Sequence, residues 1–439
     1  MRLIKATVTA AQTPAHGIQR LKCEAQPARA GEVNEALLDA INYLDLGVAV
    51  APGDTVLLNV TALDLALGTG GVAFVVPDAA APTVGEQVAP TVGEAVGEQD
   101  APTVGEAVGE QVAPIAERGR AFAGKQAAPA TGHIMKLRYT PLQREVLSVE
   151  EQASPWHETM VAARSLEGAP VVCCELFSQA PLVAAAVKHR ARAARVILCM
   201  TDEAALLLGF AELAAAAREE GLFDGIITCG QALGGDLEAV NLFSGLLAAR
   251  HVLGADVMVT AMGPGIVGTA TPFGHGGLAQ AVALNAAAAL DAVPIAVLRL
   301  SFADCRSRHQ GLSHHTLTAL GTATLTPAVI AFPDDLPSEQ AQRIERALEA
   351  AKILERHALV RVATDANAID LRGLEVTTMG RTQAEDPAFF SAAFAAGILA
   401  ADLLADDLLA PGSLAPGSLA DDLLAPGSLA DGVPGERTL

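Results

Sequence analysis

Between residues 169 and 362, short apolar runs alternate with longer segments of helical character, and this alternation constrains the fold more than any other feature. Seven runs of four to seven mainly apolar residues have the length of buried strands. They are 171–176, 195–200, 225–229, 256–261, 294–300, 328–332 and 359–362. Helical segments lie between most of them, at 182–192, 204–219, 237–251, 278–290 and 339–357. The pattern predicts an α/β domain over 165–404, with a mostly parallel, doubly wound sheet and helices on both faces.

Outside this alternation, a last helix over 387–404 is expected to pack across one face of the sheet. The first 78 residues instead contain short apolar runs broken by Gly and Pro, which predict a small barrel or sandwich. A helix over 33–46 is expected to plug or flank it. A strand over 134–139 is expected to close it and would place Lys136 and Arg138 on one face. The predicted β-rich domain therefore comprises 1–78 and 118–150.

Two low-complexity segments complete the chain. The unit APTVGE begins at residues 81, 89 and 101, and units such as LAPGSLADDL follow residue 405. Both segments contain too little apolar surface to build a core, so 79–117 and 405–439 are predicted to be disordered. Residues 79–117 carry seven acidic and no basic side chains, and residues 401–439 carry seven acidic side chains and one arginine. The rest of the chain therefore has a net charge of about −8 out of −21.

Several classes of protein have little support. No basic stripe with interleaved aromatic residues is present, so nucleic-acid binding is not expected. No apolar run reaches the length of about 18 residues that a membrane span needs. None of the six cysteines belongs to a CxxC pair, and the N-terminal residues lack the long apolar run of a signal peptide. We therefore predict a reduced, cytoplasmic protein without a membrane partner.

Polar or glycine-rich loops follow the central strands of the predicted sheet. In a parallel sheet such loops lie along one edge, where ligands bind. The loops supply these candidate ligand-binding residues: Asp202, Asp236, Glu238, Asn241, Gly263, Gly265 and Thr269. The glycines offer backbone N–H groups that can cradle an anion, although the loop has neither a Walker motif nor GxGxxG. The alternatives are that the glycines serve only the turns and that Asp236 is a helix N-cap.

The most polar loop follows the apolar run 294–300. Arg306 and Arg308 provide forked donors suited to a carboxylate or phosphate, so we expect a small anionic ligand here. His309 or His314 could act as a general acid or base, with Asp304 to orient it. Surface salt bridges and a structural hydrogen-bond network are the alternatives.

A metal site is a further alternative for this loop. Asp304, His309, His314 and His315 are residue types that bind metals, but they lack a known spacing such as HExxH. The nearby arginines would repel a cation. We therefore assign no metal ligand and leave the cofactor open.

Four long motifs resemble a bacterial family of uncharacterised proteins, the domain of unknown function 3866. They are GHIMKLRYTPLQ at 132–143, GDLEAVNLFSGLLAA at 235–249, MGPGIVGT at 262–269 and SFADCRSRHQGLSHHT at 301–316. Shorter matches are GDTVLLNVTA at 53–62 and LGTGG at 67–71. The resemblance covers nearly all of the chain except the two repeat segments. It implies a bacterial cytosolic protein but no particular activity.

Two hypotheses follow. The first is an enzyme that binds a small anionic, phosphorylated or nucleotide-like molecule at the carboxyl edge of the sheet. It requires Arg308, Asp236 and Gly265 to share one face. The second is a non-catalytic ligand-binding or assembly module whose polar loops form a subunit interface. The alanine-rich surface would support a homo-oligomer.

Overall fold

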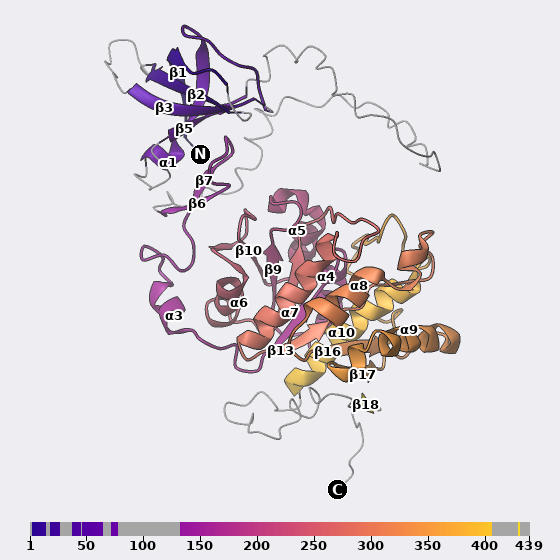
Figure 1. Cartoon of the computed structure of the whole chain (residues 1–439). Helices are drawn as coiled ribbons and strands as arrows, with labels where there is room; N and C mark the ends of the chain where they lie inside the picture. The colour runs from indigo at the N-terminus through magenta and orange to yellow at the C-terminus, as the bar shows by residue number, and fades with distance from the viewer. Residues whose placement is uncertain are drawn as a thin grey trace, which may run out of the picture. The chain divides into compact units, whose positions relative to one another are not determined.

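The computed structural model describes residues 2–14, 18–26, 37–44, 46–64, 72–77, 132–405 and 429–430. The chain forms two compact units, Met1–Val146 and Leu147–Leu439 (Figure 1). The boundary falls close to residue 150, the predicted end of the β-rich domain. The predicted disordered insertion 79–117 lies outside the described residues, as does almost all of the predicted tail.

The first unit contains a closed five-stranded barrel with the strand order β1-β2-β3-β5-β4. The strands are β1 (Leu3–Ala11), β2 (Ile18–Ala25), β3 (Leu37–Tyr43), β4 (Thr55–Asn59) and β5 (Val72–Val76). Alternate side chains point inward and form a small apolar core that includes Val8, Cys23 and Leu58. A short helix α1 (Thr61–Asp64) follows β4, and β6 (Ile134–Lys136) pairs with β7 (Arg144–Val146). The predicted β-rich unit is therefore confirmed.

Two local predictions in this unit are wrong. The expected helix over 33–46 is strand β3 where the structure describes it, because alternate residues are buried and the segment pairs with both β2 and β5. The expected strand over 134–139 ends at Lys136, since Leu137 and Tyr139 both adopt positive φ angles. Lys136 and Arg138 therefore do not share a strand face.

The second unit is built on a nine-stranded sheet in which every pairing is parallel, as predicted. Its order is β11-β10-β9-β12-β8-β13-β16-β17-β18. The strands are β8 (Pro170–Cys173), β9 (Val196–Thr201), β10 (Gly225–Cys229), β11 (Leu237–Ala239), β12 (Val257–Met262), β13 (Val293–Ala296), β16 (Val329–Pro333), β17 (Ala358–Val362) and β18 (Leu429–Ala430). Strands β12 and β13 lie on opposite sides of β8 in the sheet. The chain passes from one side to the other after β12, so the strand order changes direction at β8. Ligands bind at such switch points in open α/β sheets.

Helices cover both faces of this sheet, which makes the fold doubly wound. One face packs against α4 (Gln179–Arg190), α5 (Glu212–Glu219) and α10 (Pro387–Ala405). The other packs against α6 (Leu242–His251), α7 (Ala279–Ala289) and α9 (Ser338–Ala350). Shorter helices are α3 (His157–Ala162) and α8 (His314–Thr318). The predicted helix over 204–219 begins only at Glu212, and the one over 237–251 is divided into β11 and α6.

Helix α10 is the one described helix that is long and apolar enough to cross a membrane, with a mean hydropathy of 1.9. It is 78% buried within its own unit, however, and packs against α4 and the sheet. Burial on all sides explains its composition, because a helix that is apolar all round suits the core of a large domain. Gly397 permits the contact with α4, since a Cβ there would overlap the Val183 carbonyl oxygen.

We expect Gly397→Ala to destabilise the protein although alanine favours helix formation. The gain in helix propensity is about 1 kcal/mol, whereas overpacking a core costs roughly 1–3 kcal/mol, more where backbone must move. Urea unfolding would show a lower midpoint than for the wild type. The control is Gly321→Ala, where the nearest atom to a new Cβ would lie 3.6 Å away. Equal midpoints for the two variants would contradict the packing argument.

Candidate functional site

The carboxyl ends of β8, β12 and β13 carry the polar groups that the fold brings together at its switch point. Glu175 follows β8, the glycine-rich loop 263–278 follows β12, and Arg299 follows β13. The short antiparallel pair β14 (Leu300–Ser301) and β15 (Gly311–Leu312) then returns the chain to α8. This return places the histidines of 309–315 beside Glu175.

Glu175 is fully buried and lies at the centre of an ion network. Its Oε1 is 3.3 Å from both Arg299 Nη1 and His315 Nδ1, and Thr316 Oγ1 donates a hydrogen bond of 2.5 Å to Oε2. Burial alone would raise the pKa of the Glu175 carboxyl, but the His315 hydrogen bond, the Arg299 charge and the Thr316 hydroxyl together lower that pKa. Glu175 is therefore an anion at neutral pH.

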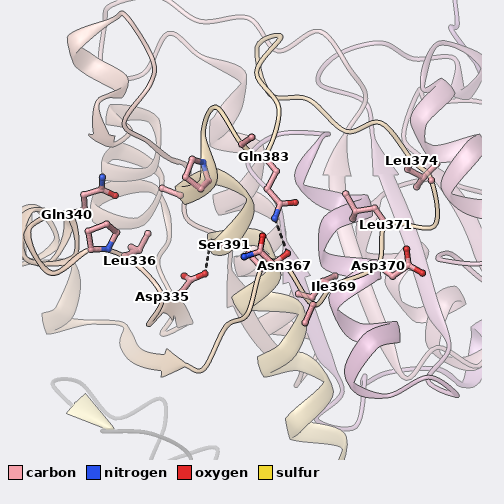
Figure 2. A pocket seen from close by; sticks show the side chains of 17 residues that line it. Asp335, Leu336, Gln340, Asn367, Ile369, Asp370, Leu371, Leu374, Gln383 and Ser391 are labelled. Atoms are coloured by element: carbon pink, nitrogen blue, oxygen red, sulfur yellow. Dashed lines mark hydrogen bonds between the residues drawn. The ribbon is translucent and has the colours of Figure 1, made fainter.

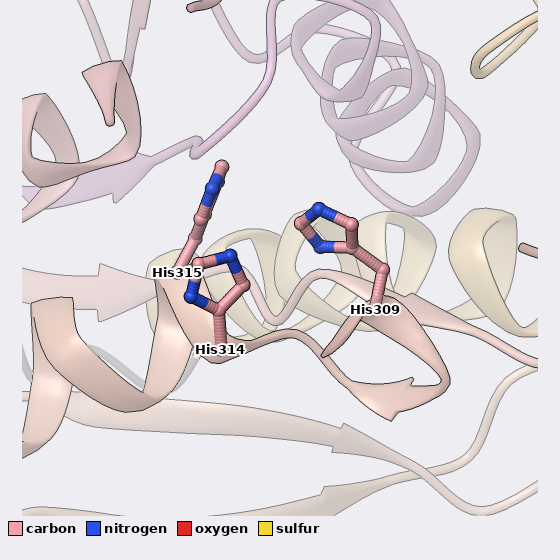
Figure 3. Close-up of side chains that lie close together, drawn as sticks. All are labelled: His309, His314 and His315. Carbon is pink, nitrogen blue, oxygen red and sulfur yellow. The ribbon is translucent and has the colours of Figure 1, made fainter. Parts of the chain in front are cut away.

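His309, His314 and His315 gather beside this network. One ring nitrogen of each lies within 4.8 Å of the others, and Figure 3 shows the three rings close together. His309 comes from a 3₁₀ turn (Ser307–His309), whereas the other two begin α8. Ser313 connects the 3₁₀ turn to α8, because its Oγ accepts from the His315 backbone N–H and lies 2.9 Å from His309 Nδ1.

His275 extends the cluster from the glycine-rich loop. Its ring stacks on that of His315 with centroids 3.9 Å apart and planes inclined by 5°. His275 Nε2 donates to the Pro272 carbonyl over 2.9 Å, so Nδ1 carries the lone pair, and this buried nitrogen has no partner in the described part of the chain. Burial lowers the pKa of His309 to about 3 and that of His314 to about 4. These two imidazoles are therefore neutral at pH 7.

Most ions next to the cluster neutralise one another. Asp304 is bound by Arg306 Nε at 2.9 Å and Nη2 at 2.7 Å, and it also contacts Arg381. Asp386 accepts from Arg381 Nε at 3.0 Å and from Ser301 Oγ at 2.6 Å. Asp304 therefore forms ion pairs with arginines and does not orient His309. Ser313 is the residue beside His309, where we expected Asp304. Arg306, expected to bind an anion, is already paired.

Arg308 is the exception in this loop. Its Nε is buried and has no hydrogen-bond partner among the described residues. The guanidinium also lowers the pKa of His314 through its charge, after burial and the neighbouring imidazoles, so it lies close to the cluster. Arg308 is thus the predicted ligand-binding arginine that remains available.

The glycine-rich loop contacts the cluster with its backbone. A Cβ at Gly277 would lie 3.1 Å from Glu175 Cγ, and one at Gly268 would lie 3.0 Å from His315 Cε1. These glycines therefore allow a close approach to the histidines. Thr269 bonds within the loop, to Thr271 Oγ1 and the Gly274 carbonyl, and Gly263 packs on the Ala205 carbonyl. Gly265 has a φ of 96° and open space around it.

The predicted acidic residues lie elsewhere. Asp202 accepts from Gln231 N at the same sheet edge. Asp236 instead bonds Ile226 N at the amino end of β10 and pairs with Arg218, so it shares no face with Arg308. It is not the helix cap either, because Asn241 caps α6 by accepting from Ser244 N.

Glu238 belongs to the edge strand β11 and bonds Thr228 Oγ1 and Gly234 N. Five strand spacings separate β11 from β13, or roughly 24 Å. Asp236 and Glu238 therefore cannot contact a small ligand held by Arg308. The expectation that Arg308, Asp236 and Gly265 share one face is wrong because of Asp236. The first hypothesis therefore fails in the form that included Asp236, and only a smaller site built on Arg308 and the histidines remains.

A separate pocket of about 1030 Å³ opens past the carboxyl ends of β16 and β17 (Figure 2). Burial raises the pKa of Asp335, whose carboxylate accepts from Ser391 Oγ at 2.9 Å, and Gln383 Nε2 donates to the Ala366 carbonyl. None of the described residues lining it is basic. It therefore does not suit an anion and differs from the predicted site.

With this geometry described, the chain can be compared with known proteins. The sequence profile of a family described as "Protein of unknown function (DUF3866)" matches residues 39–397. The chain belongs to this family. No curated protein and no solved structure matches it. Membership confirms the resemblance seen in the motifs, and the chemistry of this DUF3866 protein must be argued from its own residues.

Glu175→Gln should lower the free energy of unfolding by about 3–5 kcal/mol, because it leaves the Arg299 charge buried without a counter-ion. Urea unfolding at pH 7 measures the loss. The matched control is Glu167→Gln, whose side chain is 56% exposed in its pair with Arg250. Its expected change is about 0–1 kcal/mol. Similar losses in both variants would refute a central role for Glu175.

Asp304 should contribute to acid sensitivity. Hydrogen bonds and charge from Arg306 hold the pKa of this carboxyl well below its usual value, although burial opposes them. Because the folded pKa is below the unfolded value of about 3.9, the stabilisation is present above that pH and is lost as pH falls towards the folded pKa.

Asp304→Asn should therefore be less stable than the wild type at pH 7 and should lose less stability between pH 5 and pH 3. Urea midpoints over this range test both expectations. The exposed carboxylate variant Glu219→Gln is the control and should follow the wild-type curve. If the urea midpoint of Asp304→Asn falls with pH as steeply as that of the wild type, Asp304 does not contribute to acid sensitivity.

Proposed function

We propose that this protein is a cytosolic bacterial enzyme that binds a small anionic molecule, phosphorylated or nucleotide-like, beside the histidine cluster. The observation that carries the proposal is the unpartnered, buried Nε of Arg308. A buried donor without an acceptor costs about 1–3 kcal/mol, and a carboxylate or phosphate oxygen would remove this cost. The fold adds support, because the cluster lies at the switch point beside β8.

Charge balance favours an anion over a neutral ligand. Arg299, Arg306 and Arg381 are each paired with a buried carboxylate, whereas Arg308 makes no ion pair among the described residues. The available positive charge is therefore localised at one side chain. A guanidinium binds phosphate or carboxylate through two parallel hydrogen bonds, which fixes the orientation of the ligand as well as its charge.

The imidazoles would carry the chemistry. His314 is partly exposed, and its buried Nε2 has no partner among the described residues, which leaves this nitrogen for a ligand held by Arg308. His309 is oriented through Nδ1 by Ser313, which leaves Nε2 for the ligand. We assign these two residues to proton transfer, with Ser313 in the orienting role first expected of Asp304.

A second candidate function is an assembly module, in which a second copy of the chain covers the site. One observation favours it: the loop beside the cluster exposes Val267 and Phe273 at 68% and 62%. Exposed apolar side chains on a loop next to a polar site suit a homo-oligomeric interface. Sedimentation of the wild type and of Phe273→Ser over a range of concentrations distinguishes the two functions. If the loop forms a subunit interface, the variant should self-associate more weakly than the wild type; otherwise the two should sediment alike.

Arg308→Ala should abolish anion binding without unfolding the protein. Thermal shifts of the full chain would be recorded with inorganic phosphate, sugar phosphates, nucleotides and dicarboxylates. A ligand at a hundred times its Kd stabilises the fold by about 2.7 kcal/mol, which a melting curve resolves. We expect at least one anion to raise the wild-type melting temperature and the shift to disappear in Arg308→Ala.

The matched control is Arg346→Ala, which removes an exposed arginine from α9 and leaves the site intact. It should retain the full shift, and Arg308→Lys should retain part of it, because lysine keeps the charge but loses the fork. A wild-type shift that persists in Arg308→Ala, or a blank response to every anion, would reject the proposal.

A further inference from the structure

We infer that His309, His314 and His315 form a binding site for a divalent transition-metal ion of the zinc class. The site rests on the proposed function, because it would bind the same anion, but it revises the role of two residues: with the ion bound, His309 and His314 would hold the metal instead of transferring protons themselves. The first observation is geometric: one ring nitrogen of each lies within 4.8 Å of the others, and two of the three residues are buried.

The second observation concerns unsatisfied nitrogens. Nε2 of His314 and Nε2 of His315 are both buried without a hydrogen-bond partner among the described residues. His309 uses Nδ1 to contact Ser313 Oγ, which leaves its Nε2 for another partner. Two buried, unpaired imidazole nitrogens in one cluster are costly, and a shared metal ion would satisfy both.

The surroundings of the rings match those of metal ligands. A metal-bound histidine usually directs its other ring nitrogen to a carboxylate, hydroxyl or carbonyl, which fixes the tautomer. His315 Nδ1 lies 3.3 Å from Glu175 Oε1, and His309 Nδ1 lies 2.9 Å from Ser313 Oγ. If His315 Nδ1–H donates to Glu175, the lone pair of its Nε2 faces the cluster.

Arg299 Nη1 also lies 3.0 Å from His315 Nδ1 and could donate to it in the other tautomer. That tautomer would leave Nε2–H as a buried donor without an acceptor. In the tautomer that binds metal, Arg299 and His315 both direct a hydrogen to the Glu175 carboxylate, and their two nitrogens lie side by side 3.0 Å apart. Nε2 has no partner among the described residues in either tautomer, and a metal ion would satisfy it in the tautomer with the proton on Nδ1.

Charge repulsion from the nearby arginines, the objection raised by the sequence, is reduced in the folded protein. Glu175 compensates Arg299, and Asp304 compensates Arg306. Only Arg308 keeps an unpaired charge in this loop among the described residues. An anion bridging the metal ion and Arg308 would complete the balance, which joins this site to the proposed anion site.

The donor set selects the ion. Imidazole nitrogens bind zinc, cobalt, nickel and copper, whereas magnesium and calcium require oxygen ligands. Three imidazoles leave a fourth position open, as in catalytic zinc sites. With Zn–N bonds of about 2.1 Å, tetrahedral ligands lie roughly 3.4 Å apart, so the rings would turn inward on binding. The open position would accept water or an oxygen of the anion.

The test uses the full-length, untagged chain after removal of metal with a chelator. Cobalt is titrated in and followed by its visible absorption bands, zinc is measured by competition and by metal analysis, and magnesium serves as the oxygen-preferring comparison. We expect one equivalent of cobalt or zinc per chain and none of magnesium. His314→Ala and His309→Ala should each weaken binding at least tenfold, whereas the exposed-site control His189→Ala should not change it.

Because His315 packs inside the ion network, the ligands are also identified on the wild type itself. Diethyl pyrocarbonate labelling with mass spectrometry should show zinc protecting His314, the partly exposed member of the cluster, but leaving the exposed His189 reactive. The inference is overturned if the wild type binds less than a fifth of an equivalent of zinc and cobalt. It is equally overturned if bound zinc leaves His314 as reactive as in the metal-free protein.

The metal and the anion are tested separately, so that one can fail without the other. Phosphate binding is measured with chelator-treated and zinc-loaded protein, each compared with Arg308→Ala. Arg308-dependent phosphate binding in a protein that takes up no zinc would overturn the metal site and keep the proposed function. Zinc bound at the histidines without any anion response would keep the metal site and reject the proposed anion-binding function.

Discussion

The structure of the second unit depends on one buried carboxylate. Glu175 stands just past the central strand β8, where water cannot solvate its charge, so the fold must supply every partner. Arg299 comes from the end of β13, while His315 and Thr316 come from the first turn of α8. Glu175 therefore connects the end of β8 to two segments that lie 124 to 141 residues further along the chain. The histidine cluster is positioned by those same connections.

The glycines and the hairpin follow from this constraint. The loop after β12 can lie against Glu175 and His315 only because Gly277 and Gly268 have no side chains. The pair β14 and β15 brings Ser313 within reach of both His309 and the α8 backbone. Packing thus holds imidazoles from a 3₁₀ turn, the first turn of α8 and a loop close to one another. Such a rigid set of nitrogens is suited to a defined ligand geometry.

Periodicity alone predicted the parallel sheet, its flanking helices and the edge where the polar loops meet, because buried parallel strands read as continuous apolar runs. It failed where tertiary pairing decides the structure. Asp236 immediately precedes strand β11, since Leu237–Ala239 pairs with β10 instead of joining α6. Glu175 and Arg299 were not predicted as site residues, because each is a single charged residue within an apolar run. Their significance depends on a partner 124 residues away.

The carboxyl edge of the sheet contains two chemically different environments. Beside β8 and β13 it offers imidazoles and Arg308, whereas the pocket past β16 and β17 has a largely apolar lining whose polar side chains are mainly carboxylates and amides. The start of α10 borders both, because Asp386 bonds Ser301 and Arg381 on one side while Ser391, one turn later, bonds Asp335 on the other. A displacement of the first turn of α10 would therefore move side chains in both environments. The rigid packing of α10 against α4 is what keeps them fixed relative to each other.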